Sequence, residues 1–400
     1  MKRLIFLVIA ALLLVSCGGQ TSSDTSDGVL GGASLDSVVS AGEDSAVGDE
    51  VSDVTSDVTS EEAPILSKGE MLAESLSLEE RIGQMLLAAY PDVNAAETAQ
   101  RYHLGGYIMF GREFKNSTPE EITSNIASIQ SASGIPMLFA VDEEGGTVCR
   151  VSAYTQFRES RFLSPRSLFE KGGLEAIEAE EREKAALLSS LGINVNMAPV
   201  CDVTTDKSAF MYKRSLGQDA ETTSEFVRTV LDANKNARVG CVLKHFPGYG
   251  NNADTHVGIA IDERSLDELA GRDLIPFQAG IDSGCGAILV SHTFINCLDP
   301  DYPATLSVGV HEYLRNEMGF DGVIVTDDLS MQAITDLYGE GEAAVLAVLA
   351  GNDLLCCGSI ETRYQAILDA VNSGRIDESL ITSAAARVLQ WKYELGLIAE

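Results

Sequence analysis

Basic residues are scarce in this sequence. Its 400 residues include 28 lysines and arginines against 60 aspartates and glutamates, which gives a formal net charge of −32. A chain with this charge repels the phosphates of nucleic acids and the anionic head groups of lipids at long range. The composition therefore argues against a DNA- or RNA-binding protein, and we expect no nucleic acid partner.

The motifs of several common enzyme classes are also missing. No GxGxxG follows a predicted strand, and the chain has no P-loop, no GxSxG elbow and no HExxH. The eight cysteines form no CxxC or Cys/His metal spacing, so most are expected to be small buried apolar side chains. Spacing does not exclude a Ser-His-Asp hydrolase, but no serine is marked by its local sequence. We expect no cofactor.

The first residues, "MKRLIFLVIAALLLVSC", form a basic start followed by an apolar run that is short for a membrane-spanning helix. The segment resembles a bacterial lipoprotein signal that ends at a lipobox. The resemblance implies cleavage before Cys17 and lipidation of that cysteine. An uncleaved anchor or a plain secretory signal is the alternative, and either would still export the chain. We therefore expect an extracytoplasmic protein anchored to the membrane by acyl chains alone.

Residues 17–66 after this signal are rich in Ser, Thr, Gly, Val and Asp. From position 18 to 67 the chain has eleven acidic residues and no lysine or arginine. Low hydrophobicity with charge of one sign does not compensate for the entropy lost on ordering. The composition predicts a disordered acidic tether.

Residues 67–400 are predicted to form one catalytic domain. Short apolar runs alternate there with amphipathic stretches, which is typical of repeated βα units. Helices are predicted at 119–132, 173–192, 221–237, 308–319 and 381–397, and eight strands at 84–90, 105–111, 136–142, 193–203, 240–248, 287–294, 322–328 and 353–358. Eight such units predict a single (β/α)8 TIM-type barrel. A doubly wound sheet is the alternative, because periodicity cannot show that a sheet closes.

Polar residues stand at the carboxyl ends of five of the predicted strands. They are Asp142, Asp202, Lys244 with His245, His292, and Asp327 with Asp328. In a barrel this edge is where active sites form, because its loops converge on one mouth. Each residue alone could be a helix cap or a satisfied turn carboxylate. Polar residues at five strand ends together predict an active site.

Asp254 and His256 follow in the segment "KHFPGYGNNADTH" (244–256). Their spacing of one intervening residue suits a carboxylate that orients an imidazole better than two ligands of one metal ion. An imidazole with a pKa of about 6.5 can give and take a proton near neutral pH. A set of carboxylates, an Asp-His pair and cations at one barrel mouth suits glycosidic chemistry. A retaining glycosidase needs a carboxylate nucleophile and a proton donor roughly 5 Å apart.

Five motifs carry a family resemblance. They are "VDEEGGTVCR", "MAPVCDV", "YKRSLGQDAE", "KHFPGYGNNADTH" and "FDGVIVTDDLSM". Their order and separations resemble those of the NagZ-type β-N-acetylglucosaminidases of glycoside hydrolase family 3, from about Ser67 to Glu400. The family's core is a TIM barrel, in agreement with the eight predicted strands.

The resemblance implies roles for individual residues. It makes Asp327 the nucleophile, His256 the acid/base and Asp254 the partner of His256. It also assigns binding of the terminal sugar to Asp142, Arg150, Arg214, Lys244 and His245. Asp328 is a rival nucleophile on chemistry alone, and we interpret it as a residue that structures the turn. Arg150, Arg214 and Lys244 could instead be solvated or capping residues. His292 could be either a wall of the pocket or a core histidine.

Two residues depart from the family pattern. Thr147 stands where arginine is common, and Tyr249 stands where histidine is common. The segment from Lys244 to His256 is also one residue shorter than in typical members. These departures put the preference for the leaving group and the motion of the loop in doubt.

The sequence therefore predicts an exo-acting retaining β-N-acetylhexosaminidase, expected as a monomer, acting on peptidoglycan fragments or another aminosugar glycan. A β-N-acetylglucosaminide phosphorylase is the first alternative, although the negative charge disfavours phosphate as acceptor. A β-glucosidase of the same family is the second, although such enzymes add a domain that supplies the acid/base. The alternative from another class is a non-catalytic sugar-binding lipoprotein, which would not need Asp327 or His256.

Overall fold

The computed structural model describes residues 66–250 and 260–399. The predicted signal peptide, Cys17 and the predicted tether up to position 65 lie outside these ranges, as do Asp254 and His256. No helix within the described ranges is long and apolar enough to cross a membrane. Six of the seven cysteines in these ranges are buried, Cys297 is exposed, and none of the seven is in a disulfide.

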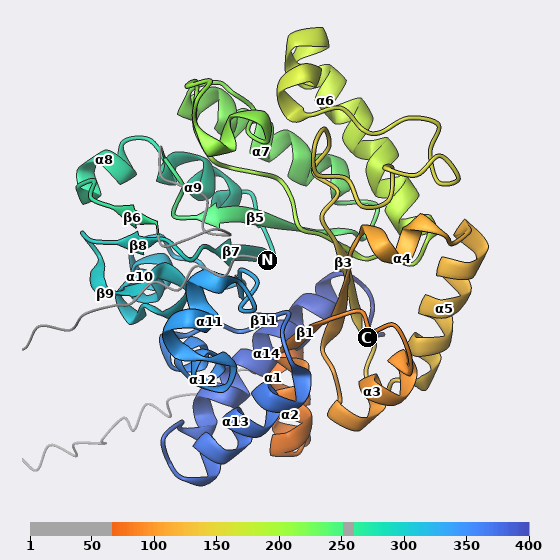
Figure 1. The fold of residues 1–400 in the computed structure, drawn as a ribbon, viewed down its shortest axis with the longest axis vertical. Helices are drawn as coiled ribbons and strands as arrows, with labels where there is room; N and C mark the ends of the chain where they lie inside the picture. The colour runs from red at the N-terminus through yellow and green to blue at the C-terminus, as the bar shows by residue number, and fades with distance from the viewer. Residues whose placement is uncertain (1–65, 251–259, 400) are drawn as a thin grey trace, which may run out of the picture. The chain divides into compact units, whose positions relative to one another are not determined.

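Eight parallel strands form the central sheet (Figure 1). They are β1 (Leu86–Ala89), β2 (Gly106–Met109), β3 (Leu138–Val141), β4 (Val195–Asn196), β5 (Gly240–Phe246), β7 (Ala287–Val290), β10 (Val323–Thr326) and β11 (Leu355–Cys356). Neighbours in the sheet are consecutive along the chain, and β11 pairs with β1. The last gap closes between β10 and the residue before β11, where Thr326 N donates to Leu354 O at 3.0 Å and Leu354 N donates to Ile324 O at 3.1 Å.

The closed ring confirms the predicted (β/α)8 barrel. Each of the eight predicted strand segments contains one of the barrel strands. A doubly wound sheet would leave two edges unpaired, and the hydrogen bonds between β10 and β11 remove them. That alternative is therefore wrong.

Helices surround the strands (Figure 1). They are α1 (Lys68–Ser75), α2 (Leu78–Gln84), α3 (Ala95–Tyr102), α4 (Gly111–Lys115), α5 (Pro119–Ala132), α6 (Pro165–Ser190), α7 (Ala220–Asn234), α8 (Leu266–Ala270), α9 (Leu274–Asp282), α10 (Val308–Glu312), α11 (Gln332–Tyr338), α12 (Glu340–Ala350), α13 (Ile360–Asn372) and α14 (Glu378–Glu394). Shorter turns are η1 (Phe210–Lys213), η2 (Ala304–Leu306) and the π-helical η3 (Tyr313–Glu317). A small second sheet joins β6 (Ile261–Asp262), β8 (Phe294–Ile295) and β9 (Asp299–Pro303).

The sequence of α5 shows why a helix forms at 119–132. Thr118 caps its first turn in a reciprocal capping box with Glu121, and Pro119 occupies the first helical position, where its missing N–H is not needed. Ile122, Ile126 and Ile129 recur at helical spacing and are buried against the barrel. The predicted range matches the observed helix.

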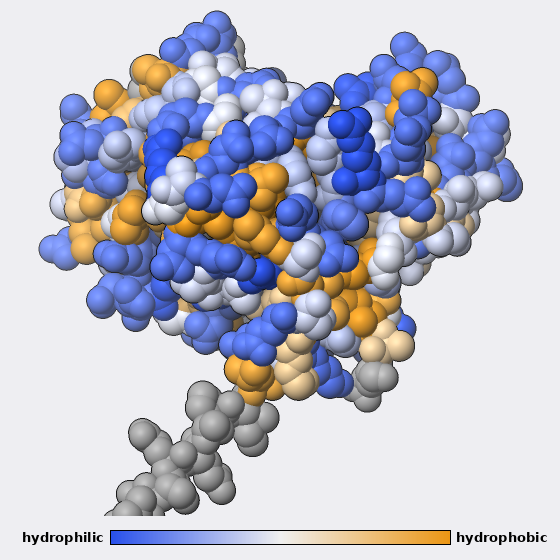
Figure 2. Space-filling model, turned by 90° about the horizontal axis from the view of Figure 1, so that it is seen from below, coloured by the Kyte–Doolittle hydropathy of each residue, from blue (hydrophilic) through white to orange (hydrophobic). Residues whose placement is uncertain are grey.

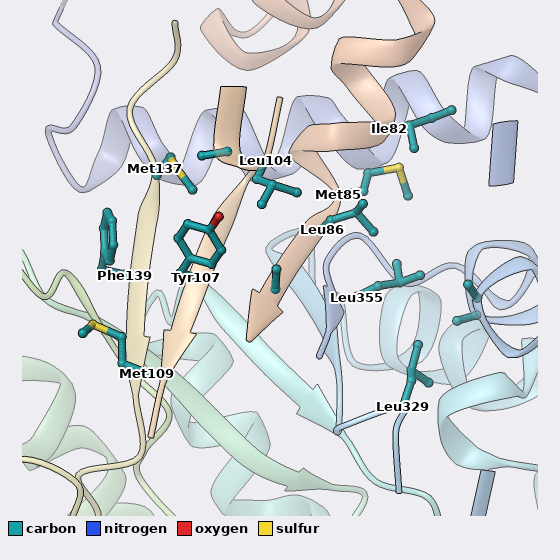
Figure 3. Close-up of a cluster of buried hydrophobic side chains, with 14 of the residues drawn as sticks. Ile82, Met85, Leu86, Leu104, Tyr107, Met109, Met137, Phe139, Leu329 and Leu355 are labelled. Carbon is teal, nitrogen blue, oxygen red and sulfur yellow. The ribbon is translucent and has the colours of Figure 1, made fainter. Parts of the chain in front are cut away.

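Alternation along the strands separates two layers of the core. Leu87 and Ile108 point into the barrel, whereas Leu86 and Tyr107 belong to the cluster between the strands and the helices. Figure 3 shows that outer cluster, in which side chains from β1, β2 and β3 meet residues of α2 and the loops. The face of the molecule in Figure 2 is mainly hydrophilic, with apolar residues gathered in patches.

Trp391 of α14 packs under the barrel interior. An added Cβ would lie 2.6 Å from the Trp391 ring at Gly240 and 2.2 Å from it at Gly286. Glycine at the first position of β5 and just before β7 therefore lets the indole approach the strands. This packing fills the amino-terminal end of the barrel and leaves the carboxyl ends for the site.

Lys392, the neighbour of Trp391, is completely buried. Its Nζ donates to Gln84 Oε1 at 2.6 Å. Burial lowers the pKa of the Lys392 ammonium to about 7. In the unfolded chain the same group has its ordinary pKa of about 10.4. The unfolded state therefore binds more protons between these two values, so stability is gained as the pH rises through this window.

We expect Lys392→Met to remove this dependence. The unfolding free energy of the wild type, minus that of the variant, should rise by about 1.4 kcal/mol per pH unit between pH 7 and 10. Urea unfolding at several pH values in this window measures the difference. Lys171→Met, at an exposed position, serves as the matched control and should give a flat difference. A flat difference for Lys392→Met as well would contradict the expectation.

Candidate active site

A cavity of about 380 Å³ opens at the carboxyl ends of the barrel strands. Seven ionisable residues that the sequence analysis singled out line this cavity: Asp142, Arg150, Arg214, Lys244, His245, Asp327 and Asp328. Phe110 and Phe210 contribute aromatic walls. Concave sites with a few convergent polar groups are typical of small-ligand binding. The structure thus brings all five predicted sugar-binding residues and the predicted nucleophile into one cavity.

A larger cavity of about 730 Å³ lies among α1, α14 and the segment before β10. It is lined by residues such as Trp391, Gly286 and Gly322, which belong to the amino-terminal side of the barrel. In barrels, this side carries residues that matter for stability. We therefore place the candidate site in the smaller cavity.

Lys244, on β5, lies between two carboxylates. Its Nζ is 2.8 Å from Asp142 Oδ1 and 2.7 Å from Glu144 Oε1. Asp142 Oδ2 also accepts from Arg150 Nη2 at 3.2 Å. Arg214 binds Glu144 through two parallel bonds, Nη2 to Oε1 at 2.7 Å and Nε to Oε2 at 2.9 Å. We call these five residues the charge network.

The charge network fixes the ionisation of its members. Burial favours the neutral form of each carboxyl and by itself would raise its pKa. At Asp142 the positive charges of Lys244 and Arg150 outweigh this effect, and the pKa is lowered. At Glu144 the charges of Lys244 and Arg214 likewise lower the pKa. Burial also opposes the charged form of Lys244, yet Asp142 and Glu144 raise its pKa. All three groups are therefore charged at neutral pH.

His245 has partners on both ring nitrogens. Nδ1 lies 2.9 Å from Asp202 Oδ2, and Nε2 lies 3.1 Å from Arg214 Nη2. A guanidinium can only donate, so Nε2 accepts and the proton sits on Nδ1, which donates to Asp202. The Tyr249 ring packs edge-on against the imidazole at 5.3 Å, and its backbone N donates to Asp202 Oδ1 at 2.7 Å. His245 is held in one tautomer and one orientation.

Glu143 organises the loop that carries Arg150. Its Oε2 accepts from the backbone N of Arg150 and of Val151, each at 2.7 Å, and Ser152 donates to Oε1. The side chain is completely buried. Glu143 therefore acts as a structural anchor for the loop and does not face the cavity.

Asp327 and Asp328 follow β10 and differ in their bonding. Asp328 Oδ1 accepts from Ser330 N at 2.8 Å and from the Ser330 hydroxyl, so this carboxylate belongs to the turn. Asp327 N donates to Val290 O at 3.0 Å, which places this residue against the end of β7, and Asp327 Oδ1 accepts from Asp328 N at 2.8 Å. Both residues line the cavity.

The structure corrects one interpretation and adds two residues. His292 does not line the cavity but is buried, so it is not a wall of the pocket. Glu144 was given no role in the sequence analysis, although a carboxylate three positions past the end of β3 was a signal that could have identified it. Asp202 was noticed only as a polar strand end, and it orients His245.

Two predicted catalytic residues cannot be placed. Asp254 and His256 lie outside the described residues, so their roles stay predictions. Within the described ranges, no group of three or more His, Cys, Asp or Glu side chains is arranged to hold a metal ion.

The fold and the site together define a class of protein, a (β/α)8-barrel enzyme whose pocket presents fixed carboxylates and cations. The comparison with protein families is specific. Residues 77–391 match the glycosyl hydrolase family 3 N-terminal domain. The chain belongs to glycoside hydrolase family 3 and is a glycoside hydrolase.

Several relatives are similar to this chain. A beta-hexosaminidase of Nitrosomonas eutropha is 31% identical over 284 residues, which cover 68% of this chain and 81% of the relative. Beta-hexosaminidase LpqI of Mycobacterium tuberculosis is 30% identical over 331 residues, 79% of this chain and 83% of the relative. A solved family 3 beta-N-acetylglucosaminidase from Paenibacillus matches with a TM-score of 0.75 and 31% identity, and covers 81% of this chain. The match spans only 64% of the Paenibacillus chain.

We expect Glu144→Gln to destabilise the protein strongly. The change keeps the shape but leaves Lys244 and Arg214 buried without this counter-charge. Removing one partner of a buried ion pair lowers the unfolding free energy by about 3–5 kcal/mol. Urea unfolding at pH 7 measures the loss.

Glu342→Gln is the matched control, since Glu342 pairs with Arg375 on the surface, where both side chains are more than 40% exposed. Its loss should stay below about 1 kcal/mol. Equal losses in the two variants would mean that the charge network contributes no more than a surface pair.

Proposed function

We propose that this protein is an exo-acting, retaining β-N-acetylhexosaminidase. Its substrate would be a glycan with a terminal, non-reducing, β-linked N-acetylglucosamine, such as a peptidoglycan fragment or a related aminosugar glycan. The observation that carries the proposal is the charge network beside Asp327 at the barrel mouth. Relatives that bear the name beta-hexosaminidase support the choice of sugar.

The charge network suits the recognition of a single sugar ring. The cavity of about 380 Å³ is on the scale of a small ligand. Among the described residues two carboxylates accept from the Lys244 ammonium, which has three N–H groups, so one N–H is available for a substrate hydroxyl. Asp142 and Arg150 are partly exposed, with 16% and 32% of their side chains accessible, and can reach the same ligand. Charged donors and acceptors make the stronger hydrogen bonds.

The mechanism that we propose has two displacements. The Asp327 carboxylate attacks the anomeric carbon, the bond to the leaving oxygen breaks, and His256 gives its proton to that oxygen. Water then attacks the same carbon, its proton passes to His256, and the bond to Asp327 breaks. Two inversions retain the configuration. Asp254 would hold the His256 tautomer and stabilise the imidazolium.

The different bonding of the two adjacent aspartates supports Asp327 as the nucleophile. Asp328 Oδ1 already accepts two hydrogen bonds from Ser330, which lower its nucleophilicity and hold it in the turn. Asp327 lines the cavity, where the anomeric carbon would lie. The negative net charge disfavours phosphate in place of water as the acceptor.

A chromogenic aryl β-N-acetylglucosaminide tests the activity and the sugar. We expect the wild type to hydrolyse it in preference to the matching β-glucoside, with no sugar 1-phosphate formed when phosphate is added. Asp327→Ala should lower kcat by about 10⁴-fold relative to the wild type. Asp328→Asn keeps the size of the side chain and should retain more activity than Asp327→Ala.

If neither the wild type nor Asp327→Ala hydrolyses either substrate, the proposal that the protein is this enzyme is wrong. Sugar 1-phosphate as the main product would favour the phosphorylase.

The role of His256 predicts a dependence on the leaving group. His256→Ala should slow natural glycosides far more than aryl glycosides with acidic leaving groups, because a good leaving group needs little protonation. Comparing kcat/KM across a series of phenols measures the effect. The same loss on every substrate would assign His256 another role.

We also propose that Cys17 carries the lipid that anchors the protein outside the cytoplasm. The basis is the N-terminal sequence alone, since these residues lie outside the described ranges. We expect the full chain to sediment with membranes and Cys17→Ser to appear in the soluble or uncleaved fraction. Sedimentation of both in the same processed form would contradict lipidation at Cys17.

A further inference from the structure

Two adjacent cysteines, Cys356 and Cys357, lie where β11 ends. Both side chains are buried, and both line the cavity of the candidate site together with Asp327 and Asp328. The proposed hydrolysis uses neither thiol. The position of the two sulfur atoms relative to each other suggests a separate use for them.

The two sulfur atoms are in direct contact, since the Sγ atoms of Cys356 and Cys357 are 3.5 Å apart. Successive side chains of a regular strand point to opposite faces, which keeps the sulfurs of neighbouring cysteines apart. At Cys357 φ is 60°, in the left-handed region that residues other than glycine rarely adopt. The chain bends at this residue, and both thiols reach the same cavity.

Hydrogen bonds fix the backbone of this pair. Cys356 N donates to Thr326 Oγ1 at 2.8 Å, and Cys356 O accepts from Nη1 of the buried Arg363 at 3.1 Å. Cys357 N donates to Leu87 O at 2.9 Å. A ligand that binds both sulfurs at once therefore meets two groups that are already held together, and it loses little free energy in ordering them.

Both thiols are protonated at neutral pH. The contact with Cys356, burial and the Asp328 carboxylate hold the pKa of the Cys357 thiol well above its usual range. The contact with Cys357 lowers the pKa of the Cys356 thiol, but burial and the nearby aspartates outweigh this effect and raise it. Sulfur binds its ligands as the thiolate, so a ligand for this pair must also take up two protons.

An arsenoxide has this property. Its arsenic forms one bond to each of two sulfurs, and its oxygen accepts both thiol protons. A metal cation would have to release these protons to the solvent instead. The cavity also has apolar neighbours for an organic group, because Ile108, Met197 and Leu289 belong to the same apolar cluster as the two cysteines and line the same cavity.

We propose that Cys356 and Cys357 form a dithiol site for a trivalent organic arsenical. Two As–S bonds form, the two S–H bonds and the bond from arsenic to oxygen break, and the oxygen leaves as water with both protons. Arsenic stays trivalent, so the step needs no oxidant or reductant. The bound arsenical lies beside Asp327 and Asp328 and excludes a sugar ring from the cavity. Its effect on activity rests on the proposed function, whereas its binding does not.

Phenylarsine oxide tests the site on the full chain. We expect intact mass spectrometry to show a single adduct that survives 2-mercaptoethanol, with the mass of the reagent less one water. The adduct should be removed by 2,3-dimercaptopropanol, because only a second dithiol competes with two linked bonds. Fragmentation should place the arsenic on Cys356 and Cys357. A wild type without this adduct, or with it on another cysteine, overturns the proposal.

Serine variants supply the matched controls. Cys356→Ser and Cys357→Ser each leave one thiol and should lose the adduct that survives 2-mercaptoethanol. Cys297→Ser removes the exposed thiol and should keep that adduct. A surviving adduct on Cys356→Ser or Cys357→Ser would contradict the dithiol site. The wild-type mass measurement needs no variant, so it decides the question even where a serine variant fails to fold.

The aryl β-N-acetylglucosaminide tests the position of the site in the cavity. We expect hydrolysis by the wild type to fall in proportion to the fraction of chains that carry the adduct, and to return with 2,3-dimercaptopropanol. Full activity of the modified protein would refute the overlap with the sugar site. If the adduct forms on a wild type that cleaves no β-N-acetylglucosaminide before treatment, the proposed function fails and the dithiol site stands.

Discussion

The ammonium of Lys244, held between Asp142 and Glu144, is the interaction on which the arrangement of the site depends. It ties the end of β5 to the segment after β3, and Arg214 extends the same chain of charges to η1. Burying these charges is unfavourable unless every one of them is paired. The pairing therefore holds three distant segments in one geometry. A ligand meets groups whose orientation is already set, so little of its binding energy goes into ordering them.

The barrel makes this arrangement possible. Parallel strands present their carboxyl ends at one edge, so residues from β3, β5 and β10 meet although they are far apart in the sequence. The opposite end is closed by Trp391, which approaches the strands where Gly240 and Gly286 lack a Cβ. Apolar packing therefore closes one end of the barrel, and paired charges line the other end, where the candidate site lies.

The fold could be predicted from the sequence because its signal is local. Each barrel strand is a short apolar run between turn signals, and α5 has its cap, its proline and its apolar spacing within fifteen residues. The strand ends also pointed to Asp142, Lys244 and Asp327. Glu144 was missed because its role depends on Arg214, seventy residues away, and local patterns do not report such pairs. The bonds that bury His292 depend in the same way on Thr305, thirteen residues further along.

The adjacent residues Asp327 and Asp328 cannot be distinguished by chemical reasoning on the sequence alone, because either carboxylate could attack a sugar. The turn after β10 separates them, because Ser330 binds one oxygen of Asp328 and draws that side chain into the backbone. The carbonyl of the same residue is held by His292 from behind. Asp328 thus anchors the loop through both its side chain and its backbone, and this difference between the two residues supports the proposal that Asp327 is the carboxylate that attacks the substrate.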